Sequence, residues 1–149
     1  MVGVIRRDPP QVVGTGRSKI RTLVEKENKH PKRQGPIFHP IATGPEAEAE
    51  LARQGFTWVS VPKKGQVVTL NQKINWSTGG TTKDVTDETH SENIKLFERL
   101  GTFLADPLIG IDFIMENIGK PWTEEPKCGV IEVNSLPFLD LHMYPLVGV

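Results

Sequence analysis

The sequence is poor in cysteine, has no net charge and contains no long hydrophobic run. Its single cysteine, Cys128, cannot form a disulfide within the chain, so we expect a reducing, cytoplasmic environment. Because Cys128 precedes an apolar stretch, it is expected to be a buried thiol rather than a nucleophile. The 18 lysine and arginine residues balance the 18 aspartate and glutamate residues, which argues against a nucleic-acid or membrane-surface partner. No apolar stretch is long enough for a signal peptide or a membrane span.

Hydrophobic spacing divides the chain into strands and helices. A chain of 149 residues is long enough for one domain with a sizeable core. Ser18 is the expected N-cap of the first helix, and Asp87 that of the last helix. The last helix should pack on the hairpin formed by the last two strands, because its apolar residues share one face. The predicted strands are 2–7, 66–70, 108–115 and 129–133, and the predicted helices are 18–28, 45–54 and 90–105.

Two polar segments resemble anion-binding sequences, one a phosphate loop and the other a basic cluster that could attract an anionic substrate. Neither interpretation is supported by the details of the sequence. In GTGRSK, residues 14–19, the lysine is at the wrong distance for a phosphate loop, and paired glycines before a helix are typical of a turn. The basic segment HPKRQG, residues 30–35, is expected to lie in solvent, since short charged runs usually do.

Three oxygen-bearing side chains are expected to meet on the hairpin of 108–115 and 129–133. Glu132 and Asn134 are two positions apart on one strand, so their side chains point to the same side. Asp112 interrupts the apolar run of the other strand and would join them if it lies opposite Glu132. Two carboxylates and an amide oxygen suit Mg²⁺, which prefers oxygen ligands. On these residues alone, the commoner alternative is that the acidic side chains face solvent.

A run of small residues, NWSTGGTT at 75–82, directly follows the strand of 66–70. Its two glycines would let the backbone approach a ligand closely and leave amide groups available to bind an anion. A flexible surface loop explains the same residues equally well.

The order of these segments resembles that of an ATP-grasp domain. The similarity is carried by GIDFIMENIGKP and GVIEVNSLPFLDLHMYP, and it continues upstream through NWSTGGTTKDVTDETH, LARQGFTWVSVPKKGQVVTL and RRDPPQVVGTGRSKIRTLVEKENKHPKRQG. It covers nearly the whole chain, and it is strongest with cyanophycin synthetase, followed by bifunctional glutathione synthetase. The resemblance implies an α+β fold, the C-terminal lobe of an ATP-grasp domain, with a mostly antiparallel sheet and packed helices. Residues 1–149 would then be a partial domain.

The resemblance also implies an activity and a set of site residues. ATP would phosphorylate a carboxylate, and an amine would attack the resulting acylphosphate to form an amide, with an amino acid and a peptide-like acceptor as substrates. ATP and Mg²⁺ are the implied cofactors. The implied metal- and cofactor-binding residues are Asp112, Glu132 and Asn134, with Lys73 as a further cofactor-binding residue. The implied catalytic positions are Ser77, Thr78, Gly79, Gly80 and His142.

Several positions depart from the family pattern. Asn71 and Gln72 stand where the family commonly has a basic residue, and Lys73 is shifted along the chain from that position. In the tail, Phe138 replaces a glycine and Asp140 replaces a basic residue. These changes spare the implied metal ligands and concern the substrate side.

The preceding ATP-grasp lobe has no counterpart in the 149 residues. We therefore expect a partner lobe on a longer chain or on a separate subunit, and self-association into a homo-oligomer is left open. The alternative is a non-catalytic ATP-grasp remnant that serves binding or assembly. The substitutions favour this alternative, and the retained acidic residues oppose it. The sequence decides neither which amino acid is added nor whether the product is of the cyanophycin or the glutathione type.

Overall fold

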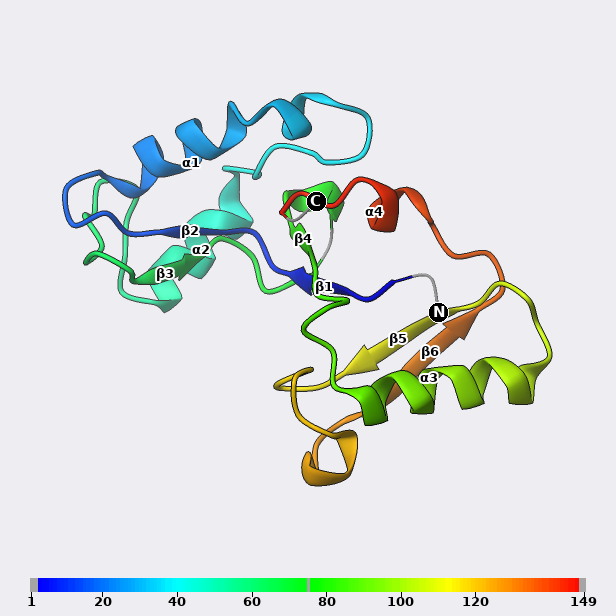
Figure 1. Cartoon of the computed structure of the whole chain (residues 1–149). Helices are drawn as coiled ribbons and strands as arrows, with labels where there is room; N and C mark the ends of the chain where they lie inside the picture. Colours follow the sequence, from blue (N-terminus) through cyan, green and yellow to red (C-terminus); the bar gives the residue numbers. More distant parts are fainter. Residues whose placement is uncertain (1–2, 75, 148–149) are drawn as a thin grey trace. The chain divides into compact units, whose positions relative to one another are not determined.

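The computed structural model describes residues 3–74 and 76–147, so the predicted strand start at Val2 and the loop start at Asn75 lie outside the described residues. The chain folds as two compact units. One unit is Arg6–Lys83, and the other is formed by the residues before and after that segment. The elements of each unit can be followed in Figure 1.

The Arg6–Lys83 unit is built on a short antiparallel pair. Strand β2 (Gln11–Val13) pairs with β3 (Val67–Thr69), with Val12 opposite Val68. Helices α1 (Ile20–Asn28) and α2 (Pro45–Arg53) pack against this pair. Their buried apolar side chains form one core, as expected for amphipathic helices on a sheet face. Its members are Val12, Ile20, Leu23, Val24, Ile41, Ala47, Leu51, Val68 and Leu70.

Both helices of this unit were predicted, with one error at a cap. Helix α2 begins at Pro45 and ends before Gly55, whose φ of 76° is favourable for glycine at a helix end. Helix α1 begins later than predicted, with Lys19 rather than Ser18 at its N-cap and no capping side chain. The backbone amide of Ser18 instead donates a hydrogen bond to the Thr15 hydroxyl oxygen at 3.0 Å, so the turn continues through Ser18.

A second two-stranded sheet joins β1 (Ile5–Asp8) to β4 (Thr81–Asp84), and the division between the units falls within both strands. Strand β4 was not predicted, because its polar sequence TTKD gives no hydrophobic alternation. Two short 3₁₀ helices complete the Arg6–Lys83 unit, η1 (Pro31–Gln34) and η2 (Trp76–Thr78).

The other unit contains the predicted hairpin and helix. Strand β5 (Gly110–Ile114) pairs antiparallel with β6 (Gly129–Asn134), and helix α3 (Ser91–Leu104) runs alongside them in Figure 1. The rings of Phe97 and Phe113 meet edge to face with centroids 5.3 Å apart, which confirms that the helix packs on the hairpin. The connection carries η3 (Trp122–Glu124), and a short unpredicted helix, α4 (Asp140–Met143), follows β6.

Two local predictions in this unit were wrong. The N-cap of α3 is His90, whose Nδ1 accepts a hydrogen bond from the Glu92 amide at 3.2 Å, and not Asp87. Cys128 is half-buried, not buried, and its Sγ lies 3.2 Å from the Trp122 carbonyl oxygen. Cys128 lies just before β6, in the connection between the two strands.

The α+β fold class is confirmed, and the strand pairs β2–β3 and β5–β6 are antiparallel. The strands form three two-stranded sheets in the described part of the chain. Among the described residues, no helix is both long and apolar enough to cross a membrane.

The connection between β5 and β6 is held by one buried amide side chain. Asn93 of α3 is fully buried. Its Nδ2 donates to the carbonyl oxygens of Ile118 and Lys120 at 2.9 and 2.7 Å, and its Oδ1 accepts from the amide of Trp122 at 2.8 Å. Every hydrogen-bonding group of this side chain therefore fixes the connection to α3.

We expect Asn93→Ala to lower the free energy of unfolding by roughly 2–4 kcal/mol, because it leaves three backbone groups without their partner. Urea denaturation would measure this loss. Asn117→Ala is the matched control in the same connection, since the exposed side chain of Asn117 accepts a hydrogen bond from the nearby Gly119 amide. Equal stability of the two variants would contradict the assigned role of Asn93.

Candidate functional site

The hairpin register brings the predicted metal ligands together. Asp112 lies directly opposite Glu132, as the sequence predicted. Because paired residues of an antiparallel ladder share a face, their carboxylates lie on the same side. Asn134 is two residues beyond Glu132 and shares that face. A register irregularity follows Asp112, where Phe113 pairs with Val130, so the alternation is uninterrupted only between Gly110 and Asp112.

Gly110 makes room for the Asn134 side chain. These two residues are opposite each other in the ladder. A Cβ at position 110 would lie 2.9 Å from Asn134 Oδ1 and 3.0 Å from Pro137 Cβ. The amide of Asn134 therefore occupies the space that a larger side chain at Gly110 would fill. Its Oδ1 is buried and has no hydrogen-bond partner among the described residues.

A buried oxygen without a donor is costly unless something else satisfies it. Together with the two carboxylates, this oxygen forms a donor set that suits a hard cation such as Mg²⁺. In the described residues, no three side chains from His, Cys, Asp and Glu gather as a metal site. The hairpin set has a different composition, two carboxylates and one asparagine, whose amide oxygen can also serve as a ligand. The residues present therefore fit a divalent cation whose shell is completed by other oxygens.

The predicted small-residue loop belongs to the other unit. Ser77 and Thr78 lie in η2, and Gly79 and Gly80 follow it and are buried. The Gly79 amide donates to the Trp76 carbonyl oxygen at 3.2 Å, so this amide is already used within the loop. Lys73 precedes the loop and is exposed, and its backbone amide donates to Asn71 Oδ1 at 2.9 Å.

Gly79 docks the loop on the segment around Ile41. Its φ is 95°, in the region that favours glycine, and a Cβ there would overlap the backbone of Ile41. The Ala42 amide donates to the Thr78 carbonyl oxygen at 3.5 Å. Asn28 of α1 holds Ile41 in turn, through hydrogen bonds to its amide and carbonyl of 2.7 and 3.1 Å. The loop thus rests on a fixed backbone surface.

Segment 30–35 is exposed as predicted, except for Arg33, which is buried. Its side chain is 1% exposed. The guanidinium donates to the carbonyl oxygens of His39 and Gly79 at 2.9 and 3.0 Å, and it pairs with Glu27 at 3.3 Å. Burial lowers the pKa of Arg33, and the Glu27 carboxylate opposes that shift. The charge of Arg33 suggested a surface residue, but its buried side chain anchors the Gly79 loop.

The two residues that replace the family's basic position bind acidic side chains of α2. Asn71 Nδ2 donates to Glu46 at 3.1 Å, and Gln72 Nε2 donates to Glu50 at 3.2 Å. Glu50 is buried and also pairs with Arg53, which lowers the pKa of the Glu50 carboxyl, with smaller contributions from Gln72 and Gln54. Glu46 has a neutral partner in Asn71, so its charge is not balanced by that contact.

His142 lies in α4, beside Gly3 and Asp84. Its Nδ1 is buried and has no hydrogen-bond partner among the described residues. Burial lowers the pKa of His142, and the Asp84 carboxylate opposes this shift. The pKa of Asp84 is lowered mainly by hydrogen bonds from Thr86, with the Thr86 amide 2.8 Å away. Of the two tail substitutions, Phe138 is 48% exposed and Asp140 is in the first turn of α4.

Sequence reasoning missed two residues that position the candidate site. Gly110 had a visible signal, since a glycine within a strand often marks a close approach of another group. Arg33 had no such signal, because its burial depends on Gly79, which is distant in sequence, as well as on Glu27 and His39.

We expect Arg33→Met to loosen the loop, because it removes the donor that holds the carbonyls of His39 and Gly79. Hydrogen exchange at the amides of Gly79 and Gly80 should become at least about tenfold faster, which corresponds to about 1.4 kcal/mol of lost local stability. Lys26→Met, which removes an exposed positive charge, is the control and should leave these rates unchanged. Unchanged exchange in both variants would exclude the anchoring role.

We expect His142 to make stability depend on pH. Its folded-state pKa lies below the usual 6.5, so the unfolded chain binds more protons just below pH 6.5 and the free energy of unfolding falls as pH falls through that range. The pKa of Asp84 is lowered from its usual value of 3.8, so the Asp84 carboxyl affects the free energy of unfolding only at lower pH. Urea denaturation at several pH values would show this fall in the wild type and its loss in His142→Gln. Exposed His30→Gln should retain it, and a His142→Gln profile identical to the wild type would contradict the prediction.

Comparisons with known proteins agree on one family. The chain is 36% identical over 151 residues to a cyanophycin synthetase from Geminocystis herdmanii, covering 99% of this chain and 17% of that protein. It is 32% identical over 151 residues to a bifunctional glutathione biosynthesis protein from Clostridium perfringens, covering 99% of this chain and 19% of that protein. No family model matches the chain.

A solved structure shares the fold. The crystal structure of a bifunctional glutathione synthetase from Pasteurella multocida matches with a TM-score of 0.89 and 32% identity, over 100% of this chain and 21% of that one. The chain thus spans about a fifth of the length of the relatives it matches. The chain belongs to the ATP-grasp ligase family, as a homologue of one segment shared by cyanophycin synthetases and bifunctional glutathione synthetases.

Proposed function

We propose that this chain forms part of an ATP-dependent carboxylate–amine ligase of the cyanophycin synthetase type. The observation that carries the proposal is the hairpin register, which places Asp112 opposite Glu132 with the unsatisfied Asn134 oxygen on the same face. Membership of a ligase family supplies the reaction class. The resemblance in sequence supplies the cofactors, ATP and Mg²⁺.

Asp112, Glu132 and Asn134 would hold Mg²⁺, and the phosphate oxygens of ATP would complete its shell. When bound, the metal offsets negative charge that develops on the phosphates during phosphoryl transfer. Gly110 keeps Asn134 in place by leaving space for its amide. The ladder fixes the backbones of Glu132 and Asp112 opposite each other.

In the proposed reaction, a substrate carboxylate oxygen attacks the γ-phosphorus of ATP, ADP leaves, and an acylphosphate forms. The amine then attacks the acyl carbon, phosphate leaves, and one proton is released from the nitrogen. Ser77, Thr78, Gly79 and Gly80 would close beside the reacting groups. The buried anchor at Arg33 would keep this loop in place, since it bonds the Gly79 carbonyl. His142 would orient the tail, and exposed Lys73 would contact nucleotide or substrate.

The remaining parts of the proposal concern partners. The relatives are about five times longer than the matched segment, which supports a further lobe on a longer chain or a separate subunit. An amino acid and a peptide-like acceptor are the proposed substrates, in a cytoplasmic setting.

A second candidate function is a non-catalytic member of the family that serves binding or assembly. Asn71 and Gln72 favour it, because both are engaged with acidic side chains of α2 rather than presenting a positive charge. Asp140 and Phe138 favour it too, since they add a negative charge and a bulky ring to the tail. The acidic pair on the hairpin opposes it.

The decisive experiment is a calorimetric titration of ATP with Mg²⁺ into the 149-residue chain. We expect binding in the wild type that falls at least about tenfold when Asp112→Ala and Glu132→Ala are combined, because the metal loses both carboxylates. The double variant Glu116→Ala, Glu124→Ala removes two exposed carboxylates of the connection and should bind like the wild type.

Two outcomes would contradict the proposal. Unchanged affinity in the Asp112, Glu132 double variant would show that the metal does not bind at the hairpin. No heat in the folded wild type would show that this chain alone does not hold the nucleotide, and a second failure after addition of the missing lobe would favour the non-catalytic candidate.

A further inference from the structure

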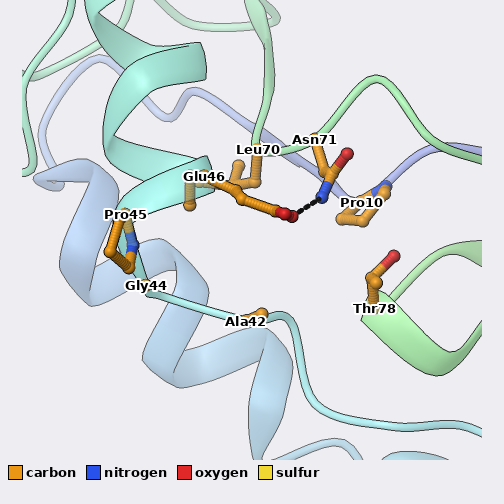
Figure 2. Close-up of a pocket in the computed structure, with 9 residues that line it drawn as sticks. Pro10, Ala42, Gly44, Pro45, Glu46, Leu70, Asn71 and Thr78 are labelled. Atoms are coloured by element: carbon orange, nitrogen blue, oxygen red, sulfur yellow. Dashed lines mark hydrogen bonds between the residues drawn. The ribbon is translucent and has the colours of Figure 1, made fainter.

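A cavity of about 310 Å³ lies in the Arg6–Lys83 unit, beside the small-residue loop. Figure 2 shows it between the start of α2, the Leu70–Asn71 segment and Thr78 of η2. Most of its lining is apolar, and Glu46 is its one charged lining residue among the described residues. Pockets of this kind, with apolar walls and few polar groups, are the usual form of small-molecule sites. Its lining residues are Pro10, Ala42, Gly44, Pro45, Glu46, Ala47, Leu70, Asn71 and Thr78.

Backbone hydrogen bonds connect the walls of this cavity. The Leu70 amide donates to the Pro10 carbonyl oxygen at 2.7 Å, and the Ala42 amide donates to the Thr78 carbonyl oxygen at 3.5 Å. Leu70 and Ala47 also belong to the buried core of this unit. Ala42, Pro45 and Glu46 are exposed, so the pocket is an open cleft at the edge of this core.

The Glu46 carboxylate is held in place by a neutral partner. Figure 2 shows its side chain reaching toward Asn71, whose Nδ2 donates to it at 3.1 Å. The Asn71 amide is itself oriented, because its Oδ1 accepts from the Lys73 backbone amide at 2.9 Å. Glu46 lies in the first turn of α2, where the helix dipole favours a negative charge. Within the described residues, no cationic side chain pairs with Glu46.

We propose that this pocket is a subsite for a primary ammonium group carried on an alkyl chain. One hydrogen bond from Asn71 leaves most of the acceptor capacity of the Glu46 carboxylate unused. An ammonium group would supply both the donors and the missing charge, and its alkyl stem would lie against Pro10, Pro45 and Leu70. A basic side chain at position 71 would neutralise Glu46, whereas Asn71 fixes the carboxylate and leaves its charge in place.

As a substrate subsite, the pocket rests on the proposed function. A carboxylate stabilises the protonated form of a bound amine, and a protonated amine has no lone pair with which to attack. The group held by Glu46 is therefore not the reacting amine but a cationic anchor elsewhere on the amino acid or peptide substrate. Because Thr78 belongs to the loop of Ser77 to Gly80, a substrate anchored here would lie next to that loop.

The test is a nuclear magnetic resonance titration that needs neither nucleotide nor metal. The probes are Nα-acetyl-lysine amide and Nα-acetyl-norleucine amide, which differ by the ammonium group at the end of the side chain. We expect the lysine probe to shift the Asn71 side-chain amide and the Thr78 backbone amide, with an affinity at least about tenfold higher than that of the norleucine probe.

Glu46→Gln should abolish the preference for the lysine probe. Glu48→Gln is the matched control, since Glu48 lies in the same first turn and bonds Trp58 instead of Asn71, and it should keep the preference. Equal affinity for both probes, a preference that survives in Glu46→Gln, or no shift with the lysine probe would overturn the inference. Since the titration omits ATP and Mg²⁺, its failure is independent of the outcome for the metal site on the hairpin.

Discussion

The candidate metal site depends on one constraint, the antiparallel register of β5 and β6. Pairing of Asp112 with Glu132 places two carboxylates on one face, and pairing of Gly110 with Asn134 gives the amide a space without a Cβ. A shift of one residue would turn one carboxylate to the opposite face and remove the space for Asn134. The register is supported from outside the hairpin, because Asn93 of α3 fixes the connection between the two strands and Phe97 packs on Phe113.

The small-residue loop of the other unit is positioned by a different kind of contact. Gly79 approaches the backbone of Ile41 closely, and the buried Arg33 guanidinium bonds the Gly79 carbonyl. Burying a guanidinium is costly unless its donors are satisfied, and Glu27, His39 and Gly79 provide most of that compensation. The anchor thus ties the loop to α1 and to the segment that leads into the Glu46 pocket. The small-residue loop and the pocket around Glu46 share Thr78, so we expect a structural change in one to alter the other.

Asn71 and Gln72, near the small-residue loop, affect what the surface beside α2 can bind. Asn71 and Gln72 use their amides to hold Glu46 and Glu50, so α2 and the end of β3 remain tied together. The same contacts leave the pocket with a negative charge. The relatives share the fold, and the charge of the pocket comes from Glu46. The proposed metal site on the hairpin and the proposed ammonium subsite around Glu46 therefore depend on separate residues.

Much of the fold followed from local sequence. Helices α1, α2 and α3 and the β5–β6 hairpin were predicted from hydrophobic spacing, because each buries one face against a neighbour. The opposition of Asp112 and Glu132 was predicted too, since strand alternation and a turn between the runs are enough to suggest it. Strand β4 was missed because its polar sequence forms a strand only when β1 lies beside it. The burial of Arg33, the role of Gly110 and the pocket around Glu46 depend on contacts between residues far apart in the chain. The sequence by itself determined which segments are helices and hairpin strands, and only tertiary packing decided which polar side chains are buried anchors and which remain available to a ligand.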